Sequence, residues 1–353
     1  VVPIITGTTI NSANSLLTVT FAENVYDTTS GSGSLEEGDF ALSISGGAAT
    51  IGSATPTSIS RTSQTVWVLG FSTSGIANGS ETISVVPAAG NSIYDAAANA
   101  AATSQSNNTA GLNEKVVPII TGTTINSANS LLTVTFAENV YDTTGGSGDL
   151  ERGDFALSIS GGVATIGSAT PTSILRTSQS VWVLGFSTSV PASGAETIAV
   201  VPAAGNSIYD AANNAAATSQ SNNTVALNDL AVPVIASTSV NSANSELTVT
   251  FAEDVYNTTG GSGNLDVGDF ALSISGGVAN VSATPTSILR TSQTVWVLGF
   301  STSVPANGAE TITIAPVSNS IYDVAANIAA TSQSNNTARL NDLAVPIILS
   351  ATS

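Results

Sequence analysis

The sequence has no cysteine, no methionine and no histidine, and it has only 6 basic residues against 24 acidic ones. Without histidine or cysteine there is no imidazole base, no thiolate nucleophile and no soft ligand for a transition metal. Without cysteine there is also no disulfide, so another stabilising device is expected. Because the net charge is −18, we expect no nucleic-acid partner, and cations are the natural partners.

Long apolar runs are absent as well. No stretch of about eighteen consecutive apolar residues occurs, which predicts that no segment inserts directly into a membrane. The chain begins Val1-Val2-Pro3, which indicates a mature product or an excised fragment, with any anchor outside it.

The most prominent feature that is present is an internal repeat. A Val-Pro pair recurs at Pro3, Pro118, Pro233 and Pro346, and the phrase AATSQSNNT recurs from Ala101, Ala216 and Ala329. A period near 115 residues, obtained by subtraction, is too long for a solenoid unit and fits one small domain with its own core. We predict three domains, followed by the first strand of a fourth repeat or a donor strand, with the boundaries 1–115, 116–230, 231–343 and 344–353.

Each repeat has the pattern of an all-β domain. Short segments alternate apolar or β-branched residues with small polar ones, and clusters of Gly, Asn, Ser and Pro separate them. Seven strands in a domain of this size predict a sandwich, and an odd number places the two chain ends at opposite poles. The domains are therefore expected to stack end to end. In the first repeat the predicted strands are 3–10, 16–26, 40–45, 51–60, 65–72, 81–87 and 103–112.

One tryptophan occupies the same place in each repeat, at Trp67, Trp182 and Trp296. Each lies in a segment that reads VWVLGF, which is apolar on both faces and so predicts a central strand. We interpret these residues as core side chains. A sugar-stacking tryptophan, the competing interpretation, would lie on an exposed loop.

The acidic residues gather at one end of each predicted sandwich. Counting strand directions places the loop after FAENVYD and the loop NSIYDAAAN together at the upstream pole, where the chain enters a repeat. The last strand of each repeat ends in Leu-Asn-Glu or Leu-Asn-Asp, directly before the next upstream pole. Crowded carboxylates are costly unless a cation neutralises them, so each junction is expected to collect a cation.

Hard oxygen ligands in this number favour calcium over magnesium, which keeps its waters and demands a strict octahedron. Asn257 stands where the other repeats have Asp27 and Asp142, which predicts a weaker last site. The predicted ligands are Asn113, Glu114, Glu138, Asp142, Asp210 and Asn214 at the first junction; Asn228, Asp229, Glu253, Asp254, Asp323 and Asn327 at the second; and Glu23, Asp27, Asp95 and Asn99 in the first repeat, which no linker precedes.

The segments FAENVYD, DFALSISGG and IYDAAAN occur in or near this form in every repeat, and they resemble the bacterial Ig-like domains of S-layer proteins and large repeat adhesins. The resemblance implies Ig-like β-sandwiches, a place outside the cell or on its surface, and calcium between domains. The family's loop reads D-x-A-G-N, whereas this chain has Asp95-Ala96-Ala97-Ala98-Asn99, without the glycine. We expect a structural rod or spacer that calcium stiffens at its junctions, with other copies or adjoining repeats as head-to-tail partners.

Three alternatives stay open. Asp27-Thr28-Thr29 faintly resembles the aspartic-protease motif, but that chemistry needs two carboxylates in one cleft, so we expect no enzyme. An adhesive module would bind a surface receptor or glycan through its loops. A filament subunit would donate the strand that begins at Val345 to another chain. The single lysine, Lys115, cannot form an isopeptide bond in every repeat, which leaves calcium as the expected brace.

Overall fold

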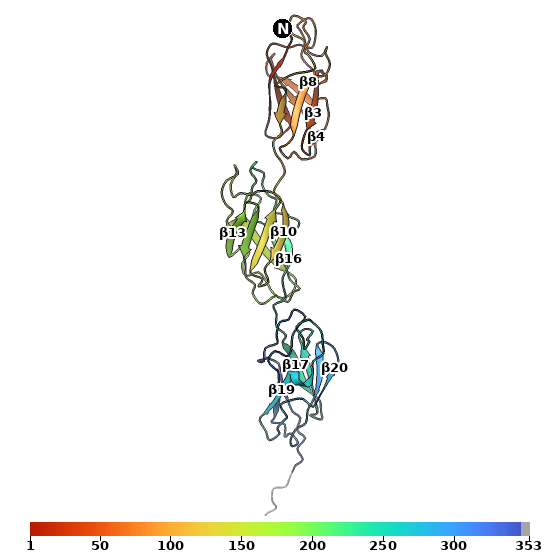
Figure 1. The fold of residues 1–353 in the computed structure, drawn as a ribbon, viewed down its shortest axis with the longest axis vertical. Coiled ribbons are helices and arrows are strands. Elements are labelled where there is room, and N and C mark those ends of the chain that lie inside the picture. The colour runs from red at the N-terminus through yellow and green to blue at the C-terminus, as the bar shows by residue number, and fades with distance from the viewer. Residues whose placement is uncertain (347–353) are drawn as a thin grey trace, which may run out of the picture.

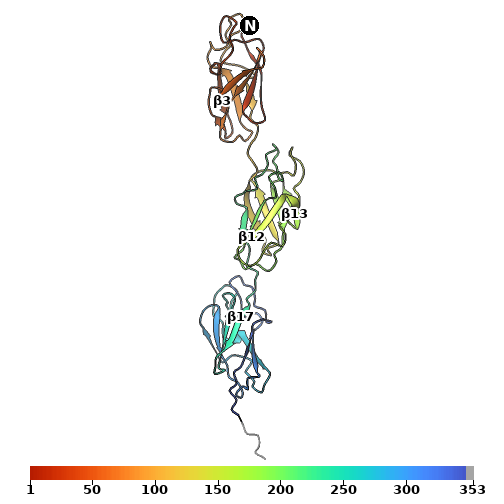
Figure 2. The same ribbon diagram turned by 180° about the vertical axis from the view of Figure 1, so that it is seen from behind.

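The computed structural model describes residues 1–346 of the chain. Three bodies lie one after another along a single long axis, and the first is at the N-terminal end (Figure 1). The view from behind shows the same row, with only a thin linker between neighbouring bodies (Figure 2). Each body has its own hydrophobic core, and the three cores draw their buried residues from 5–112, 120–227 and 235–340. Every core therefore lies within one predicted repeat.

The first repeat contains seven principal strands and a pair of two-residue strands. One sheet has the spatial order β1-β2-β6-β5 and the other has the order β3-β8-β9. With the principal strands lettered A to G along the chain, these sheets read A-B-E-D and C-F-G, which is the arrangement of a constant-type immunoglobulin domain. The strands are β1 (Ile5–Ile10), β2 (Leu16–Phe21), β3 (Phe40–Ser45), β4 (Thr50–Ile51), β5 (Ser58–Arg61), β6 (Val66–Gly70), β7 (Thr73–Ser74), β8 (Thr82–Pro87) and β9 (Thr109–Gly111).

The second and third repeats have the same strand order, β10-β11-β14-β13 with β12-β15-β16, and β17-β18-β21-β20 with β19-β22-β23. The predicted all-β, seven-stranded Ig-like sandwich is confirmed. The strands of the second repeat are β10 (Ile120–Ile125), β11 (Leu131–Phe136), β12 (Phe155–Ser160), β13 (Ser173–Ser178), β14 (Val181–Gly185), β15 (Thr197–Pro202) and β16 (Thr224–Ala226). Those of the third are β17 (Ile235–Val240), β18 (Glu246–Phe251), β19 (Phe270–Ser275), β20 (Ser287–Arg290), β21 (Val295–Gly299), β22 (Thr311–Pro316) and β23 (Thr337–Arg339).

Alternation of side chains explains why the two sheets pack face to face. In β2 the residues Leu17, Val19 and Phe21 are buried while the intervening threonines face outward, which is the period-two pattern of a half-buried strand. Phe21 meets Phe40 of the opposite sheet, with 6.4 Å between ring centroids. The predicted core role of the tryptophans is confirmed, because Trp67, Trp182 and Trp296 are each 1% exposed.

The predicted strand 51–60 is wrong in its extent. The chain forms the short strand β4, leaves the extended conformation, and resumes as β5 at Ser58. Pro56 lies in the gap and is buried, and proline interrupts a strand because it has no N–H to donate to the ladder. In the second and third repeats only the second part of this segment is a strand.

A buried glutamate closes the downstream pole, where the chain leaves a repeat. The Glu196 carboxylate is fully buried and accepts backbone N–H groups from Val163, Ala164 and Ser193, each at 2.9 Å. Two of these donors follow the turn Gly161-Gly162, in which both glycines have positive φ. A Cβ atom on Gly162 would overlap the Glu196 side chain. The equivalent carboxylates in the other repeats are Glu81 and Glu310.

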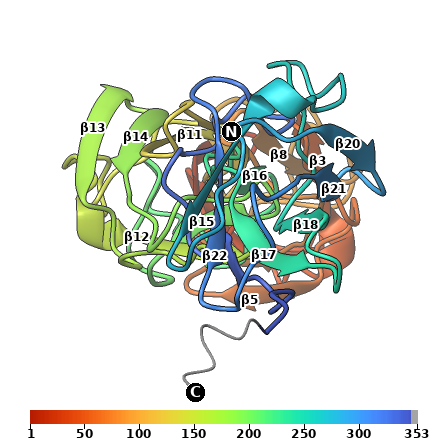
Figure 3. The ribbon, with the colours of Figure 1, turned by 90° about the horizontal axis from the view of Figure 1, so that it is seen from below.

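Successive repeats are turned relative to one another about the long axis. In the view along that axis, the equivalent strands β5, β13 and β20 lie on three different sides (Figure 3). Equivalent exposed edges therefore do not line up along one side. The three helices of the described residues are single 3-10 turns, Glu37–Asp39, Arg152–Asp154 and Val267–Asp269, and no helix in this part of the chain is long and apolar enough to cross a membrane.

Candidate metal centres at the repeat junctions

Two loops lie side by side at each upstream pole, as the count of strand directions predicts. Tyr26 and Tyr94 exchange two backbone hydrogen bonds of 2.8 Å, which join the loop after β2 to the loop before the last strand. Tyr141 pairs in the same way with Tyr209, and Tyr256 pairs with Tyr322. The acidic residues next to these tyrosines are thereby brought together.

The second of these loops buries an aspartate in each repeat. Asp210 is 1% exposed, and one of its carboxylate oxygens accepts the backbone N–H groups of Ala212 and Asn214 at 2.8 and 2.7 Å. The other oxygen accepts the side-chain amide of Asn214 at 2.7 Å. These three hydrogen bonds hold the Asp210 carboxylate in one orientation. The loop therefore presents a fixed carboxylate to the junction.

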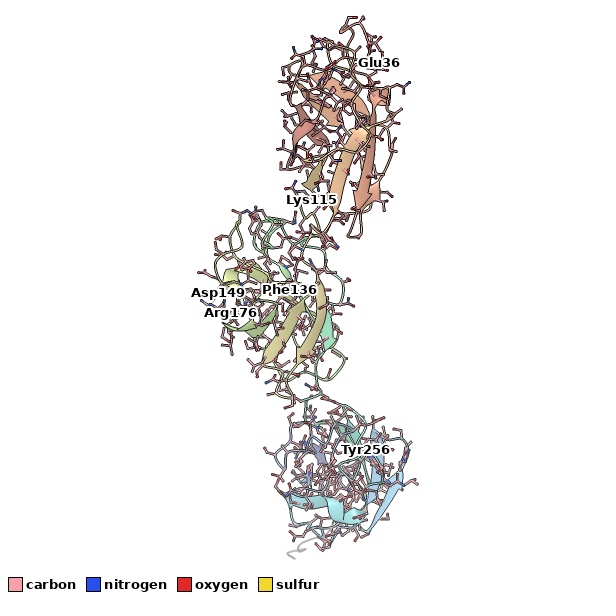
Figure 4. The ribbon with its side chains drawn as sticks, turned by 45° about the horizontal axis from the view of Figure 1, so that its top comes forward. Glu36, Lys115, Phe136, Asp149, Arg176 and Tyr256 are labelled. Carbon is pink, nitrogen blue, oxygen red and sulfur yellow. The ribbon has the colours of Figure 1, made fainter. Side chains whose placement is uncertain are left out.

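The first junction brings three carboxylates together. Glu114 comes from the linker after β9, Glu138 from the loop after β11, and Asp210 from the tyrosine-paired loop. One oxygen of each lies within 4.8 Å of the others. Lys115, the next linker residue, marks this junction between the first and second bodies (Figure 4). A hollow beside the cluster is lined by residues of both repeats, namely Asn78, Glu114, Val116, Ala137 and Glu138.

The electrostatics of this cluster are unfavourable without a counter-charge. Burial raises the pKa of Glu114 to about 7, assisted by its hydrogen bond to Asp210 and by repulsion from Asp210 and Glu138. Burial and the charge of Asp210 also raise the pKa of Glu138 above its ordinary value. No cationic side chain forms an ion pair with this cluster among residues 1–346, where the one salt bridge joins Arg176 to Asp149 (Figure 4). A bound cation would relieve the repulsion.

The second junction repeats the arrangement with one shorter side chain. Asp229, Glu253 and Asp323 approach within the same 4.8 Å limit, and Asp323 is 1% exposed. Burial raises the pKa of Glu253 to about 7, with further contributions from Asp323, Asp229 and the neighbouring Asp254. Burial also raises the pKa of Asp229. The chain thus has two acidic clusters that can hold a metal ion, one at each junction of the described residues.

The donor set fits a hard cation. All three protein ligands are carboxylates, and two ligands on opposite sides of an ion at about 2.4 Å lie about 4.8 Å apart. Three carboxylates supply up to six oxygens, and waters in the adjoining hollow can complete a shell of six to eight. Magnesium demands a near-ideal octahedron and is usually held by one or two protein carboxylates, whereas calcium accepts more oxygen ligands in a less strict geometry.

The asparagines predicted as ligands have other roles. Asn214 presents its amide nitrogen to the cluster, donating to Glu114 Oε2 at 2.5 Å and to Asp210 Oδ2 at 2.7 Å. Asn327 and Asn99 likewise donate to Asp323 and Asp95, at 2.7 Å each. In this structure each of these three asparagines uses its amide nitrogen to orient an aspartate, whereas a metal ligand has to offer an oxygen lone pair.

The predicted ligands Asn113 and Asn228 bond to the first turn of their own repeat in this structure. Asn113 donates its side-chain amide to Asn14 Oδ1 and Asn11 O, and Asn228 bonds in the same way to Asn129 and Asn126. Both amides therefore tie the last strand to the first turn of their own repeat.

Three aspartates lie outside the clusters too. Asp142 lies near Asp154 and Glu151, and its charge contributes to the raised pKa of Asp154 after the larger effect of burial. In the first repeat the charge of Asp27 likewise contributes to the raised pKa of Asp39, after the larger effect of burial. Asp254 is exposed and acts on Glu253 only through its charge. In the first repeat Glu23 and Asp95 belong to no group of three acidic ligands among the described residues.

Two sets of acids were not singled out as functional by the sequence interpretation. Glu81, Glu196 and Glu310 are buried in the downstream poles, and Asp39, Asp154 and Asp269 each accept a backbone N–H that opens a 3-10 turn. A glutamate directly before an apolar strand in ETISVVP, ETIAVVP and ETITIAP is the signal for the first set.

The comparisons with known proteins concern the architecture alone. No model of a known protein family matches the sequence, and no curated protein matches it. Among solved structures, FdeC, an adhesin of Escherichia coli, aligns over 93% of this chain and 96% of its own, with 15% identity and a TM-score of 0.27. Invasin, a bacterial integrin-binding protein, aligns over 89% and 56%, with 11% identity and a TM-score of 0.23. The eight N-terminal Ig domains of Down syndrome cell adhesion molecule align over 96% and 42%, with 12% identity and a TM-score of 0.19.

Proposed function

We propose that the chain is an extracellular spacer whose length is its function and whose junctions are stiffened by calcium. The observation that carries the proposal is the convergence of three carboxylates at each of two junctions. In both clusters one acid belongs to the linker and two belong to the next repeat. An ion bound to all three fixes the orientation of the next repeat relative to the strand that enters it.

Calcium is the proposed ion because the ligands are hard carboxylate oxygens, which calcium binds in a less strict geometry than magnesium does. Calcium modules outside cells bind with dissociation constants of about 10⁻⁴–10⁻³ M, which suits fluids rich in calcium. An apo junction has raised carboxyl pKa values and a thin linker, so it is expected to bend. In this proposal the partners of each repeat are its neighbours, head to tail, and the place of action is the cell surface or its surroundings.

Small-angle X-ray scattering of the whole chain tests the proposal. At about 3.3 Å per strand residue the six-residue strands span about 20 Å, and with the loops at both poles and the linkers we expect three repeats to make a rod on the order of 100 Å. Calcium should increase the maximum dimension and sharpen the distance distribution, and EDTA should reverse both changes. Magnesium should have a smaller effect.

A double variant supplies the matched control. Glu138→Gln with Glu253→Gln removes one carboxylate from each cluster, and neither side chain has a hydrogen bond in the structure that the change would break. The variant should keep its fold and lose its response to calcium. If the wild-type scattering is the same in calcium and EDTA, or if the variant responds as the wild type does, the proposal is wrong.

The predicted donor strand does not enter this proposal. Val345 and Pro346 are exposed and outside any strand, and residues 347–353 lie outside the described part of the chain.

A further inference from the structure

The first and last strands of each repeat lie in different sheets, so no backbone ladder joins them. Side chains join them instead. At the upstream end, Gln105 Oε1 accepts the backbone N–H of Ile5 at 2.8 Å. In the middle, the Thr8 hydroxyl lies 2.7 Å from Thr109 O and 3.0 Å from Asn107 O. It can donate its hydrogen bond to either of these two carbonyl oxygens. These contacts link β1 directly to β9 and the segment before it.

An asparagine clasp closes the downstream end of the same seam. Asn14 Nδ2 donates to Asn113 O at 2.7 Å, and Asn14 Oδ1 accepts the backbone N–H and the side-chain amide of Asn113 at 2.9 and 2.8 Å. The Asn113 amide also donates to Asn11 O at 3.0 Å. Asn14 is only 7% exposed and has a φ of 54°, so the turn holds its side chain in one place. The residue after Asn113 is the junction acid Glu114.

The seam, defined as the glutamine, threonine and asparagine contacts just described, occurs in all three repeats. The hydrogen-bonded partners are 97 to 102 residues apart in the chain. The second repeat has Gln220 with Ile120, Thr123 with Thr224, and Asn129 with Asn228. The third has Gln333 with Ile235, Thr238 with Thr337, and Asn244 with Asn341.

The order of the contacts fixes how the seam responds to tension. Ile5, Thr8 and Asn14 meet Gln105, Thr109 and Asn113 in ascending order, so the first and last strands run in the same direction. The chain enters at one pole and leaves at the other (Figure 1). Tension between the two ends therefore slides the first strand against the last, and the contacts along the seam are loaded in parallel. A shear of this kind requires several hydrogen bonds to break together.

We propose that the seam is the load-bearing contact of each repeat, so that the chain resists tension as well as setting a distance. The force enters through the first strand, crosses the seam and leaves through the clasp into the next linker. The two sheets and the core are then not on the shortest path of the force. This inference needs no metal at the junctions and goes beyond the proposed spacer.

Single-molecule pulling at constant force on the whole chain, in EDTA, tests the inference. The variant T8V/T123V/T238V replaces each seam hydroxyl with a methyl group of the same shape. Loss of one hydrogen bond that carries load should raise the unfolding rate of each repeat about fivefold. The matched control is T6V/T121V, because Thr6 donates within its own sheet to Thr20 O at 3.2 Å and Thr121 does the same to Thr135 O. The third repeat has Ala236 at this position.

Urea unfolding of both variants separates a mechanical role from a general loss of stability. We expect similar urea midpoints for the two sets and a faster unfolding under load for the seam set alone. Equal rates under load in both sets, or rates that simply follow the urea midpoints, would overturn the inference. If the triple variant does not fold, the single change T123V leaves two unmodified repeats in the same molecule as references. Failure of the calcium proposal would appear in the scattering experiment and would leave the pulling experiment, which is done in EDTA, unaffected.

Discussion

The substitution Glu253→Gln should change the stability of the folded state in opposite directions in EDTA and in calcium. Glu253 is half-buried beside Asp229 and Asp323, and it has no hydrogen bond of its own that the structure shows. In EDTA at about pH 8 the variant should be more stable than the wild type, because it removes a charge that burial and repulsion disfavour. In excess calcium it should be less stable, because it removes a ligand.

The magnitude in EDTA follows from the raised pKa of Glu253. The difference between about 7 in the folded state and the ordinary 4.5 corresponds to roughly 3 kcal/mol above pH 7, and solvent screening reduces this to about 1–2 kcal/mol. A folded-state pKa above the unfolded value makes the folded state lose stability as pH rises through it. The gain from the substitution should therefore vanish below about pH 4, where the carboxyl is protonated in both states.

The magnitude in calcium follows from linkage. An ion at a concentration one hundred times its dissociation constant stabilises the folded state by about 2.7 kcal/mol, and the variant should lose most of that. Urea unfolding of the third repeat can be followed alone in a background with Trp67 and Trp182 replaced by Phe, because Trp296 is then the only tryptophan. Asp254→Asn is the control, since it removes the same charge from an exposed side chain outside the cluster. A variant that is less stable than the wild type in EDTA, or equal to Asp254→Asn in calcium, would refute the reasoning.

Three further predictions concern the scaffold. Glu196→Gln should lower the free energy of unfolding by about 2 kcal/mol, because a buried backbone N–H loses its acceptor. Urea unfolding measures this loss, and a loss below about 0.5 kcal/mol would contradict the stabilising role of the buried Glu196 carboxylate. Burial raises the pKa of Glu81, Glu196 and Glu310, but their backbone hydrogen bonds lower it overall. The folded state should therefore lose stability as the pH falls through the lowered pKa, below 4.5. An acid titration followed by tryptophan fluorescence should show a smaller loss for Glu196→Gln than for the wild type. Gly162→Ala should destabilise by about 2 kcal/mol or more, through its positive φ and the overlap with Glu196. Ala98→Gly should stabilise by about 0.5–1 kcal/mol, because Ala98 has a φ of 65°; an unchanged melting temperature would contradict this.

The strands and the junction acids could be predicted from the sequence because both depend on local pattern and direction. Alternation in LLTVTF identifies β2, and an odd number of alternating strands places Glu138 and Asp210 at the pole that Glu114 enters. Ala98 stands where the D-x-A-G-N loop has its glycine, and it adopts the positive φ that glycine favours.

The asparagines could not be assigned in this way, because the partner of an amide depends on contacts that are distant in the sequence. Asn113 bonds to Asn14, 99 residues earlier, and nothing near either residue indicates that pairing. Asn214 has an oxygen and a nitrogen to offer, and only the position of the Asp210 carboxylate decides which one faces the cluster. Asp142 is not among the three clustered carboxylates of the first junction, and its charge acts on Asp154 instead.

Each repeat carries both halves of a junction, since its last segment ends in an acid and its upstream loops hold two more. Glu114 completes the loops of the second repeat, and Asp229 completes those of the third. Asp342 ends the third repeat in the same way, and Ala344 donates its N–H to it as Ala231 does to Asp229. A gene that duplicates or loses one such unit would therefore add or remove one body together with one complete junction. Recombination between the near-identical copies could change the reach of the protein in fixed steps without any new contact having to evolve.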